Sequence, residues 1–151
     1  MNQYCFLNGE IIPLAEARVS ILDIGLLRGY GIYEALAVIN GKPLHFSDHW
    51  HRLKRGAEAL HIKVPISEKL AEEKIVEIVK KSGFLTRANI RIVLTGGMAI
   101  KGIEHNLEEP TFFMIAEEWK PLPKEHYEKG AKLITHEYKR EMPRFRTTNY
   151  I

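Results

Sequence analysis

The sequence predicts an α+β fold in which an antiparallel sheet has two helices packed on it. Two Asn-Gly pairs, Asn8-Gly9 and Asn40-Gly41, each separate two strand-like segments, as the tight turns of β-hairpins do. The segments that flank these turns are residues 4–7, 10–13, 31–39 and 42–46. Two helical stretches and then further strands follow. This order favours an antiparallel sheet over the regular strand and helix alternation of a parallel one.

The two helices are bounded by capping signals. Ser47 is the expected N-cap of the first helix, which extends to about His61. Apolar residues at spacings of three and four form one face of this helix: Trp50, Leu53, Ala57 and Leu60. The second helix begins near Ser67 and stops at Gly83, a residue type that commonly ends helices.

Two further strands are expected after the helices. Within residues 89–95, Ile90, Ile92 and Leu94 stand at every second position. One face of this strand is therefore expected to belong to the core, and the other carries Arg91. Residues 111–117 are apolar enough for a buried strand, and residues 98–110 between the two strands are typical of a loop.

The chain divides near a Pro-rich stretch, Lys120-Pro121-Leu122-Pro123, which is typical of a stiff linker. We therefore expect an N-terminal α+β domain over residues 1–119 and an interdomain linker over 120–130. Residues 131–151 are then the opening segment of an incomplete C-terminal domain, with a short strand at 131–136.

Composition and charge limit the classes of function. The chain has 151 residues, of which 45% are hydrophobic, enough for one full domain and the edge of another. Its formal net charge is only +3 and the two signs are interleaved, so nucleic acid is not an expected partner. No apolar run suits a membrane span or a secretory leader, and the single cysteine, Cys5, cannot form an internal disulfide. We expect a cytoplasmic protein without a membrane partner, and we assign no metal ligands.

Arg52 is the first candidate for chemistry. It lies on the first helix, away from the apolar face and four residues before Gly56, which has no side chain to block an approaching ligand. A planar guanidinium can donate two hydrogen bonds to one anionic group, so an arginine fixed here suits a phosphate. From the residues alone, a solvated or ion-paired surface arginine is the alternative interpretation.

Four motifs occur in a familiar order along the chain. They are Gly29-Tyr30-Gly31-Ile32-Tyr33-Glu34, Asn40-Gly41-Lys42-Pro43, Asp48-His49-Trp50-His51-Arg52-Leu53 and Thr147-Thr148-Asn149-Tyr150. Together they resemble the N-terminal part of the class IV, or fold type IV, pyridoxal-phosphate enzymes: branched-chain and D-amino-acid aminotransferases, with aminodeoxychorismate lyase as a relative. The resemblance covers essentially the whole chain. It implies the N-terminal domain of the fold type IV architecture, pyridoxal 5'-phosphate as cofactor, an amino acid and a 2-oxo acid as substrates, and a homodimer.

The resemblance also implies roles for single residues. Arg52 matches the arginine that holds the cofactor phosphate in the family's His-x-x-Arg-Leu motif, and Tyr150 matches a tyrosine that contacts the cofactor's phenolic oxygen. Tyr33 matches an aromatic residue of the substrate pocket, for which an ordinary core tyrosine is the alternative. Arg28 and Arg91 are candidates for binding the substrate carboxylate, because an Arg-x-His pair of the D-amino-acid enzymes is missing from this chain; a surface ion pair is the alternative for each.

Arg146 stands where the resemblance places the lysine that forms a Schiff base with the cofactor and moves the proton. A guanidinium stays protonated at any pH that a protein survives, so Arg146 could bind cofactor or substrate only electrostatically. We expect an aminotransferase relative that is inactive by itself, both for this reason and because the C-terminal domain is missing. The alternatives are a non-catalytic binding or interaction module derived from the fold, which Arg146 favours, and an aminodeoxychorismate lyase.

Overall fold

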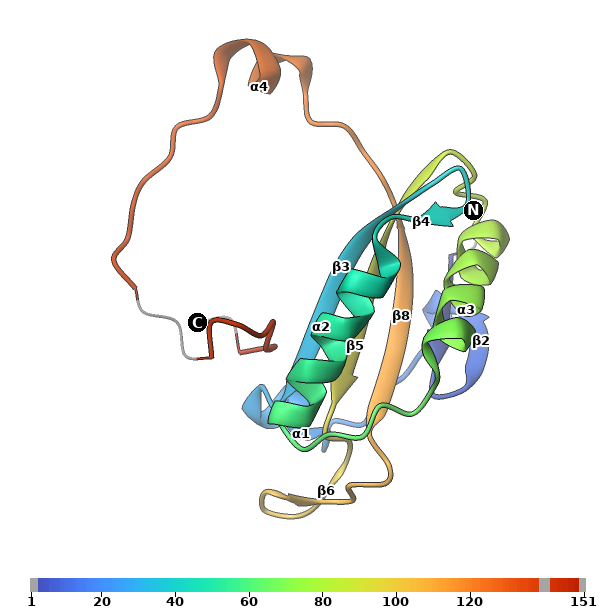
Figure 1. The fold of residues 1–151 in the computed structure, drawn as a ribbon, viewed down its shortest axis with the longest axis vertical. Coiled ribbons are helices and arrows are strands. Elements are labelled where there is room, and N and C mark those ends of the chain that lie inside the picture. Colours follow the sequence, from blue (N-terminus) through green and yellow to red (C-terminus); the bar gives the residue numbers. More distant parts are fainter. Residues whose placement is uncertain (1–2, 139–141, 150–151) are drawn as a thin grey trace.

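A single antiparallel sheet organises the chain. The computed structural model describes residues 3–138 and 142–149, and in this part six strands pair in the order β2-β1-β8-β5-β3-β4 (Figure 1). Their bounds are β1 Tyr4–Leu7, β2 Glu10–Pro13, β3 Gly31–Ile39, β4 Lys42–Pro43, β5 Arg87–Thr95 and β8 Thr111–Glu118. All neighbouring pairs are antiparallel, and the helices lie on the sheet, so the predicted α+β class is confirmed.

Two long helices, α2 (Phe46–Ala59) and α3 (Glu68–Lys81), cover one face of the sheet (Figure 1). The apolar core lies between them and the strands, and its largest fully buried side chains include Trp50, Phe6, Phe112, Leu53 and Ile75. Alternation along β3 turns Ile32, Leu36 and Val38 toward this core. Glu34 occupies the same face of β3 as these apolar residues, which makes it the one charged member of that row.

The two Asn-Gly turns were correctly predicted. Asn8 and Gly9 have φ angles of 46° and 107°, and Asn40 and Gly41 have 49° and 75°, the positive values that such hairpin turns require. The first hairpin has the predicted strands. In the second, β4 stops at Pro43 and does not reach residue 46.

The start of α2 differs from the prediction. Its N-cap is His45, with φ of 50° and no side-chain hydrogen bond, so Ser47 is not the cap. The helix begins one residue before Ser47 because Phe46 is buried, with its ring centroid 5.7 Å from that of Trp50. By contrast, Ser67 caps α3 as predicted, because its Oγ accepts a hydrogen bond from the backbone N–H of Leu70.

Several short elements were not predicted. They are the 3-10 turn Leu14–Glu16, the helix α1 (Ile24–Arg28), the hairpin of β6 (Ala99–Lys101) and β7 (Glu104–His105), and the helix α4 (Lys124–Lys129). The hairpin lies in the expected loop and α4 lies in the expected linker. The strand expected at 131–136 is wrong, because residues 131–138 have no regular structure. The domain boundaries themselves stay a prediction.

After β8 the chain leaves the sheet and returns to it. Residues 120–138 are all exposed and form a wide arc that carries α4 (Figure 1). We call this segment, residues 120–138, the arc. The chain then comes back beside β3, where the described residues 142–149 lie; we call these the return segment. No helix among the described residues is long and apolar enough to cross a membrane.

Candidate functional site

The candidate site is built on the free edge of β3. One edge of β3 pairs with β5 along its whole length, whereas β4 pairs on the other edge with Val38 and Ile39. The return segment takes up the opposite end of that second edge. The Tyr33 N–H donates to the Arg146 carbonyl at 2.8 Å, and the Thr148 N–H donates to the Gly31 carbonyl at 2.9 Å. Residues far apart in the sequence are thereby fixed side by side.

The turn before β3 helps to hold this segment. Gly29 ends α1 in the left-handed region, with φ of 64°, and its carbonyl accepts a hydrogen bond from Thr148 Oγ1 at 2.8 Å. A Cβ on Gly29 would lie 3.3 Å from the Cβ of Asn149. A glycine is therefore needed here both for its backbone conformation and for the close approach of the return segment.

Glu34, His49 and Arg52 form a polar cluster between β3 and α2, which we call the Glu34 cluster. Glu34 is only 1% exposed. Arg52 donates two hydrogen bonds to it, from Nε to Oε1 at 2.5 Å and from Nη2 to Oε2 at 2.7 Å. His49, three residues before Arg52 on the same helix, places Nδ1 2.8 Å from Glu34 Oε2. A buried carboxylate is thus satisfied by a bidentate guanidinium and an imidazole.

The Glu34 cluster keeps Arg52 charged and leaves part of it accessible. The hydrogen bond from Arg52 to Glu34 raises the pKa of the guanidinium, with smaller contributions from the charges of Glu34 and Tyr33, while burial acts in the opposite direction. The Arg52 side chain is 36% exposed, and no hydrogen-bond partner contacts its Nη1 among the residues that the structure describes. This nitrogen can donate to a ligand without breaking the bonds to Glu34.

Arg146 lies against Tyr33. Its guanidinium carbon is 4.7 Å from the centroid of the Tyr33 ring, and Nη2 donates to the Tyr33 hydroxyl at 3.2 Å. This geometry combines a cation–π contact with a hydrogen bond. Both printed side-chain contacts of Arg146 are therefore made with one residue, Tyr33.

Gly56 allows the return segment to approach α2. A Cβ at Gly56 would lie 3.3 Å from Ile32 and 3.8 Å from Phe145, so the space beside this glycine belongs to the protein's own side chains. The sequence suggested that Gly56 left room for a ligand beside Arg52. The structure shows instead that it brings Phe145 close to the helix, one turn after Arg52.

The other predicted site residues are placed as follows. Arg28 is exposed at the end of α1, and its Nη1 donates to the Leu27 carbonyl at 3.0 Å. Arg91 is exposed on the face of β5 that points away from the helices, with Nη2 3.4 Å from Glu117 Oε2, a surface ion pair. Tyr150 lies outside the described residues. The structure therefore brings Arg146 against Tyr33, holds Arg52 at Glu34, the next residue of β3, and gives Arg28 and Arg91 other contacts.

Sequence reasoning assigned no role to Glu34 or to Asp23, although each is only 1% exposed. Asp23 caps α1 and accepts hydrogen bonds from the Gly25 N–H at 2.7 Å and from the hydroxyls of Thr95 and Thr111 at 2.9 and 2.6 Å. A signal for Glu34 was available, since it occupies a core position in an alternating apolar strand and a buried carboxylate needs a partner. The partners of Asp23 come from distant strands, which no local pattern reveals.

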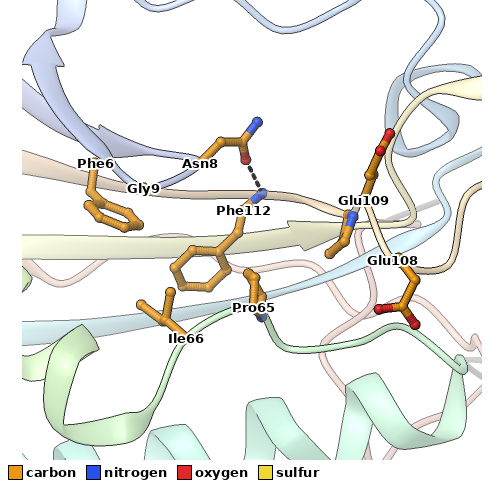
Figure 2. A pocket seen from close by; sticks show the side chains of 9 residues that line it. Phe6, Asn8, Gly9, Pro65, Ile66, Glu108, Glu109 and Phe112 are labelled. Atoms are coloured by element: carbon orange, nitrogen blue, oxygen red, sulfur yellow. Dashed lines mark hydrogen bonds between the residues drawn. The ribbon is translucent and has the colours of Figure 1, made fainter.

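A cavity lies elsewhere in the fold, where the β1–β2 turn meets the segment before α3 (Figure 2). It has a volume of about 190 Å³, and on one side Asn8 Oδ1 accepts a hydrogen bond from the Phe112 N–H at 2.8 Å. Glu108 and Glu109 also line it. Two carboxylates repel anions, so this cavity is a poorer candidate than the β3 edge for a phosphate. No metal-binding group of His, Cys, Asp or Glu side chains is found in the described part of the chain.

Comparison with known proteins decides the family. Residues 31–151 match the model of the amino-transferase class IV family. This range is most of the chain and includes the Glu34 cluster and the return segment. The chain belongs to the class IV aminotransferase family. A protein of Methanocaldococcus jannaschii that is named as a branched-chain-amino-acid aminotransferase is 31% identical over 131 residues, covering 86% of this chain and 44% of that protein. A D-alanine aminotransferase of Staphylococcus aureus is 32% identical over 107 residues, covering 70% of this chain and 36% of that protein.

The fold is shared with solved class IV structures. The branched-chain aminotransferase of the thermophilic archaeon Thermoproteus uzoniensis, solved with norvaline, superimposes with a TM-score of 0.72 at 22% identity, over 80% of this chain and 42% of that one. The chain thus spans less than half the length of these relatives. The predicted class IV resemblance is confirmed.

The family implies pyridoxal phosphate, and the residues of this chain fit one end of that cofactor. Arg52 suits the phosphate, because its guanidinium is charged, its side chain is partly exposed, and Glu34 holds it in place. At position 146, by contrast, a protonated guanidinium stacked on Tyr33 cannot act as an amine nucleophile. The site therefore fits the cofactor's phosphate and does not fit its covalent attachment.

Proposed function

We propose that this chain is the N-terminal part of a class IV aminotransferase-type protein that binds pyridoxal phosphate at the β3 edge and a small amino acid or 2-oxo acid beside it. The observation that carries the proposal is the Glu34 cluster, in which a buried carboxylate holds Arg52 with one donor left for an anion. Support also comes from the family and from the names of the relatives. By the same family resemblance we propose a homodimer in the cytoplasm.

Each residue of the Glu34 cluster has a defined part in this proposal. Glu34 fixes the plane of the Arg52 guanidinium through two hydrogen bonds, and His49 contacts the same carboxylate from the helix. Arg52 Nη1 then donates to the phosphate with little loss of side-chain entropy, because the two bonds to Glu34 already order the guanidinium. Pyridoxal phosphate, when bound, supplies the electron-withdrawing ring on which amino transfer depends.

We propose that Tyr33 and Arg146 serve the substrate rather than the phosphate. Tyr33 offers an aromatic surface for a small substrate, and the positive charge of Arg146 attracts its carboxylate. Because no amine stands at position 146, we propose that this chain by itself does not transfer amino groups. A non-catalytic binding module is therefore the second candidate function, and the Arg146 contacts favour it.

The proposal is tested by titrating the protein with pyridoxal phosphate and with pyridoxal, which lacks the phosphate, using calorimetry. We expect pyridoxal phosphate to bind at least about tenfold more tightly, and Arg52→Ala to abolish this difference, since a charge-assisted hydrogen bond is worth about 1.5–3 kcal/mol. Arg55→Ala is the matched control, an exposed arginine on the same helix that should bind like the native chain. Equal binding of the two ligands by the native protein would refute the phosphate site.

A further inference from the structure

A cleft between two loops is lined by two opposite charges that do not pair with each other. It lies where residues 18–20, before α1, face residues 109–111 at the start of β8, and its volume is about 380 Å³. Arg18 and Glu109 both line this cleft, which we call the Arg18–Glu109 cleft, without forming an ion pair with each other. A volume of this size falls within the range of small-molecule sites, about 300–1,000 Å³.

Arg18 is held so that one edge of its guanidinium stays available. Its Nη1 donates to the carbonyls of Ala15 and Ala17, each at 2.8 Å. These two bonds use both hydrogens of Nη1 and leave Nε and Nη2, the edge that can donate two parallel hydrogen bonds to one carboxylate. In the described part of the chain no residue takes up that edge. Arg18 is therefore a positioned cation with its bidentate edge open to a ligand.

Glu109 supplies the opposite charge from a well-held backbone. Its N–H donates to the Asn106 carbonyl at 3.1 Å, and a Cβ on Gly97 would overlap its carbonyl oxygen. Figure 2 shows the Glu109 carboxylate and the amide nitrogen of Asn8, which also lines the cleft, pointing away from the Phe112 ring. Among the described residues this carboxylate has no hydrogen-bond donor. An ammonium group in the cleft would therefore find an unpaired carboxylate.

The hydroxyl groups of the cleft are already oriented and still have bonding capacity. Ser20 Oγ accepts a hydrogen bond from the Leu22 N–H at 3.1 Å, so its own hydrogen remains to be donated. Thr111 Oγ1 donates to Asp23 at 2.6 Å and keeps its lone pairs. Asp23 also joins the two walls, because its N–H donates to the Ser20 carbonyl at 3.0 Å. The walls are thus fixed by the protein before any ligand arrives.

We infer that the Arg18–Glu109 cleft binds a small zwitterion, a free α-amino acid with an apolar side chain. Arg18 takes the carboxylate and Glu109 takes the ammonium group. Val19 and Met98, which are exposed and also line the cleft, contact the apolar side chain. The two protein charges sum to zero, so a zwitterion leaves no charge uncompensated, whereas a simple anion or cation does.

This site is separate from the proposed function. Thr111 belongs to β8, whereas Gly31 and Tyr33 belong to the β3 edge, and β5 lies between these two strands. Neither charge of the cleft takes part in the Glu34 cluster or contacts the return segment among the described residues. The inference therefore needs no pyridoxal phosphate, and its test uses the chain alone.

The test compares L-valine with isovalerate, which lacks the amino group, and with isobutylamine, which lacks the carboxylate. Titration of the isotope-labelled chain followed by NMR gives both the Kd and the place of binding. We expect valine to bind at least about tenfold more tightly than either analogue, because each analogue leaves one charge of the cleft unpaired. The amides of Ser20 and Thr111 should shift on addition of valine.

Variants assign the two charges. Arg18→Ala and Glu109→Gln should each weaken valine binding by about tenfold, since each removes a charged hydrogen-bonding group. Arg55→Ala and Glu73→Gln, exposed on α2 and α3, are the matched controls and should bind valine like the native chain. Exchange of the two charges, Arg18→Glu with Glu109→Arg, should bind valine more tightly than Arg18→Glu alone, because the ligand can then lie in the opposite direction.

The outcomes separate this inference from the proposed function. Equal binding of valine and isovalerate by the native chain would indicate a plain anion site and overturn the zwitterion site, as would unshifted Ser20 and Thr111 amides at millimolar valine. In Arg52→Ala, valine should still shift these amides. Loss of the shifts in that variant would place valine at the β3 edge, which overturns this inference and leaves the proposed function standing. If circular dichroism shows that Arg18→Ala disturbs the fold, Glu109→Gln decides, and native-like binding by it refutes the site.

Discussion

The sheet with its two helices and the last thirty or so residues are held by different forces. The sheet side buries a continuous apolar core, in which Phe112, Ile92 and Ile75 are completely inaccessible. The arc buries nothing: Leu133 and Ile134 are 85% and 90% exposed. The return segment is attached mainly through hydrogen bonds to the edge of β3. Burial makes the first region stable, whereas a few directional bonds give the second region, which contains Arg146, its position.

The largest expected effect comes from the core. Phe112 is fully buried, with its ring centroid 6.0 Å from Phe6 and 6.5 Å from Trp50. Phe112→Ala should lower the free energy of unfolding by about 3–5 kcal/mol, because it removes apolar contacts and leaves a cavity. Urea denaturation followed by Trp fluorescence measures this. Leu133→Ala, the matched change in the arc, should stay within about 0.5 kcal/mol of the native chain. Equal losses of stability at both positions would show that the core and the arc do not differ in this way.

The buried polar hub at Asp23 should come next. Asp23→Ala leaves the Gly25 N–H and the hydroxyls of Thr95 and Thr111 without their acceptor and removes the cap of α1. We expect a loss of about 2–3 kcal/mol in the free energy of unfolding, measured by the same denaturation. Glu16→Ala, an exposed change before α1, serves as control. An unchanged midpoint would mean that α1 does not depend on this carboxylate.

A smaller and local effect is expected in the return segment. Thr148→Val removes the hydroxyl bond to the Gly29 carbonyl, which contributes about 1 kcal/mol. Hydrogen exchange should become faster at the Tyr33 amide, which donates to Arg146, while the amides of the central strand β5 keep their rates. Thr135→Val in the exposed arc is the control. If the β5 amides accelerate as well, the two regions unfold together and the contrast drawn above is wrong.

The smallest effect concerns the pH dependence of stability and the ion pairs of Glu77 with Lys74 and Lys81 on the surface of α3. A hydrogen bond and charge from Lys74, with help from Lys81, lower the pKa of Glu77. The unfolded chain therefore binds this proton at a higher pH than the folded one, so the stabilisation is present above the ordinary glutamate pKa and is lost as pH falls below it. Glu77→Gln should slightly flatten the decline of melting temperature in acid. An unchanged acid slope would show that solvent screens the network completely.

Much of the sheet follows from local chemistry, and the site follows from it only in part. The Asn-Gly turns and the Ser67 cap predict their elements because each signal acts within four residues. Ser47 failed as a cap because the burial of Phe46, a tertiary effect, moved the start of α2. The motif containing Arg52 singled out an arginine that the structure bonds to a buried carboxylate, and its role in binding a phosphate stays a prediction. Its bond to Glu34 and the contact of Arg146 with Tyr33, 113 residues apart in the sequence, depend on the assembled sheet.

The exposed arc makes the return segment separable from the rest of the molecule. A protease cut within residues 120–138 would cross no buried backbone, and the sheet with its two helices would keep its core. The piece after the cut, which includes the return segment, would then become a peptide that can leave the β3 edge or rejoin it as an added strand. The arc acts as a tether that sets a high effective concentration of that peptide. A nicked chain supplied with synthetic peptides, with arginine or lysine at position 146, would thus exchange the key residue of the site without refolding the domain.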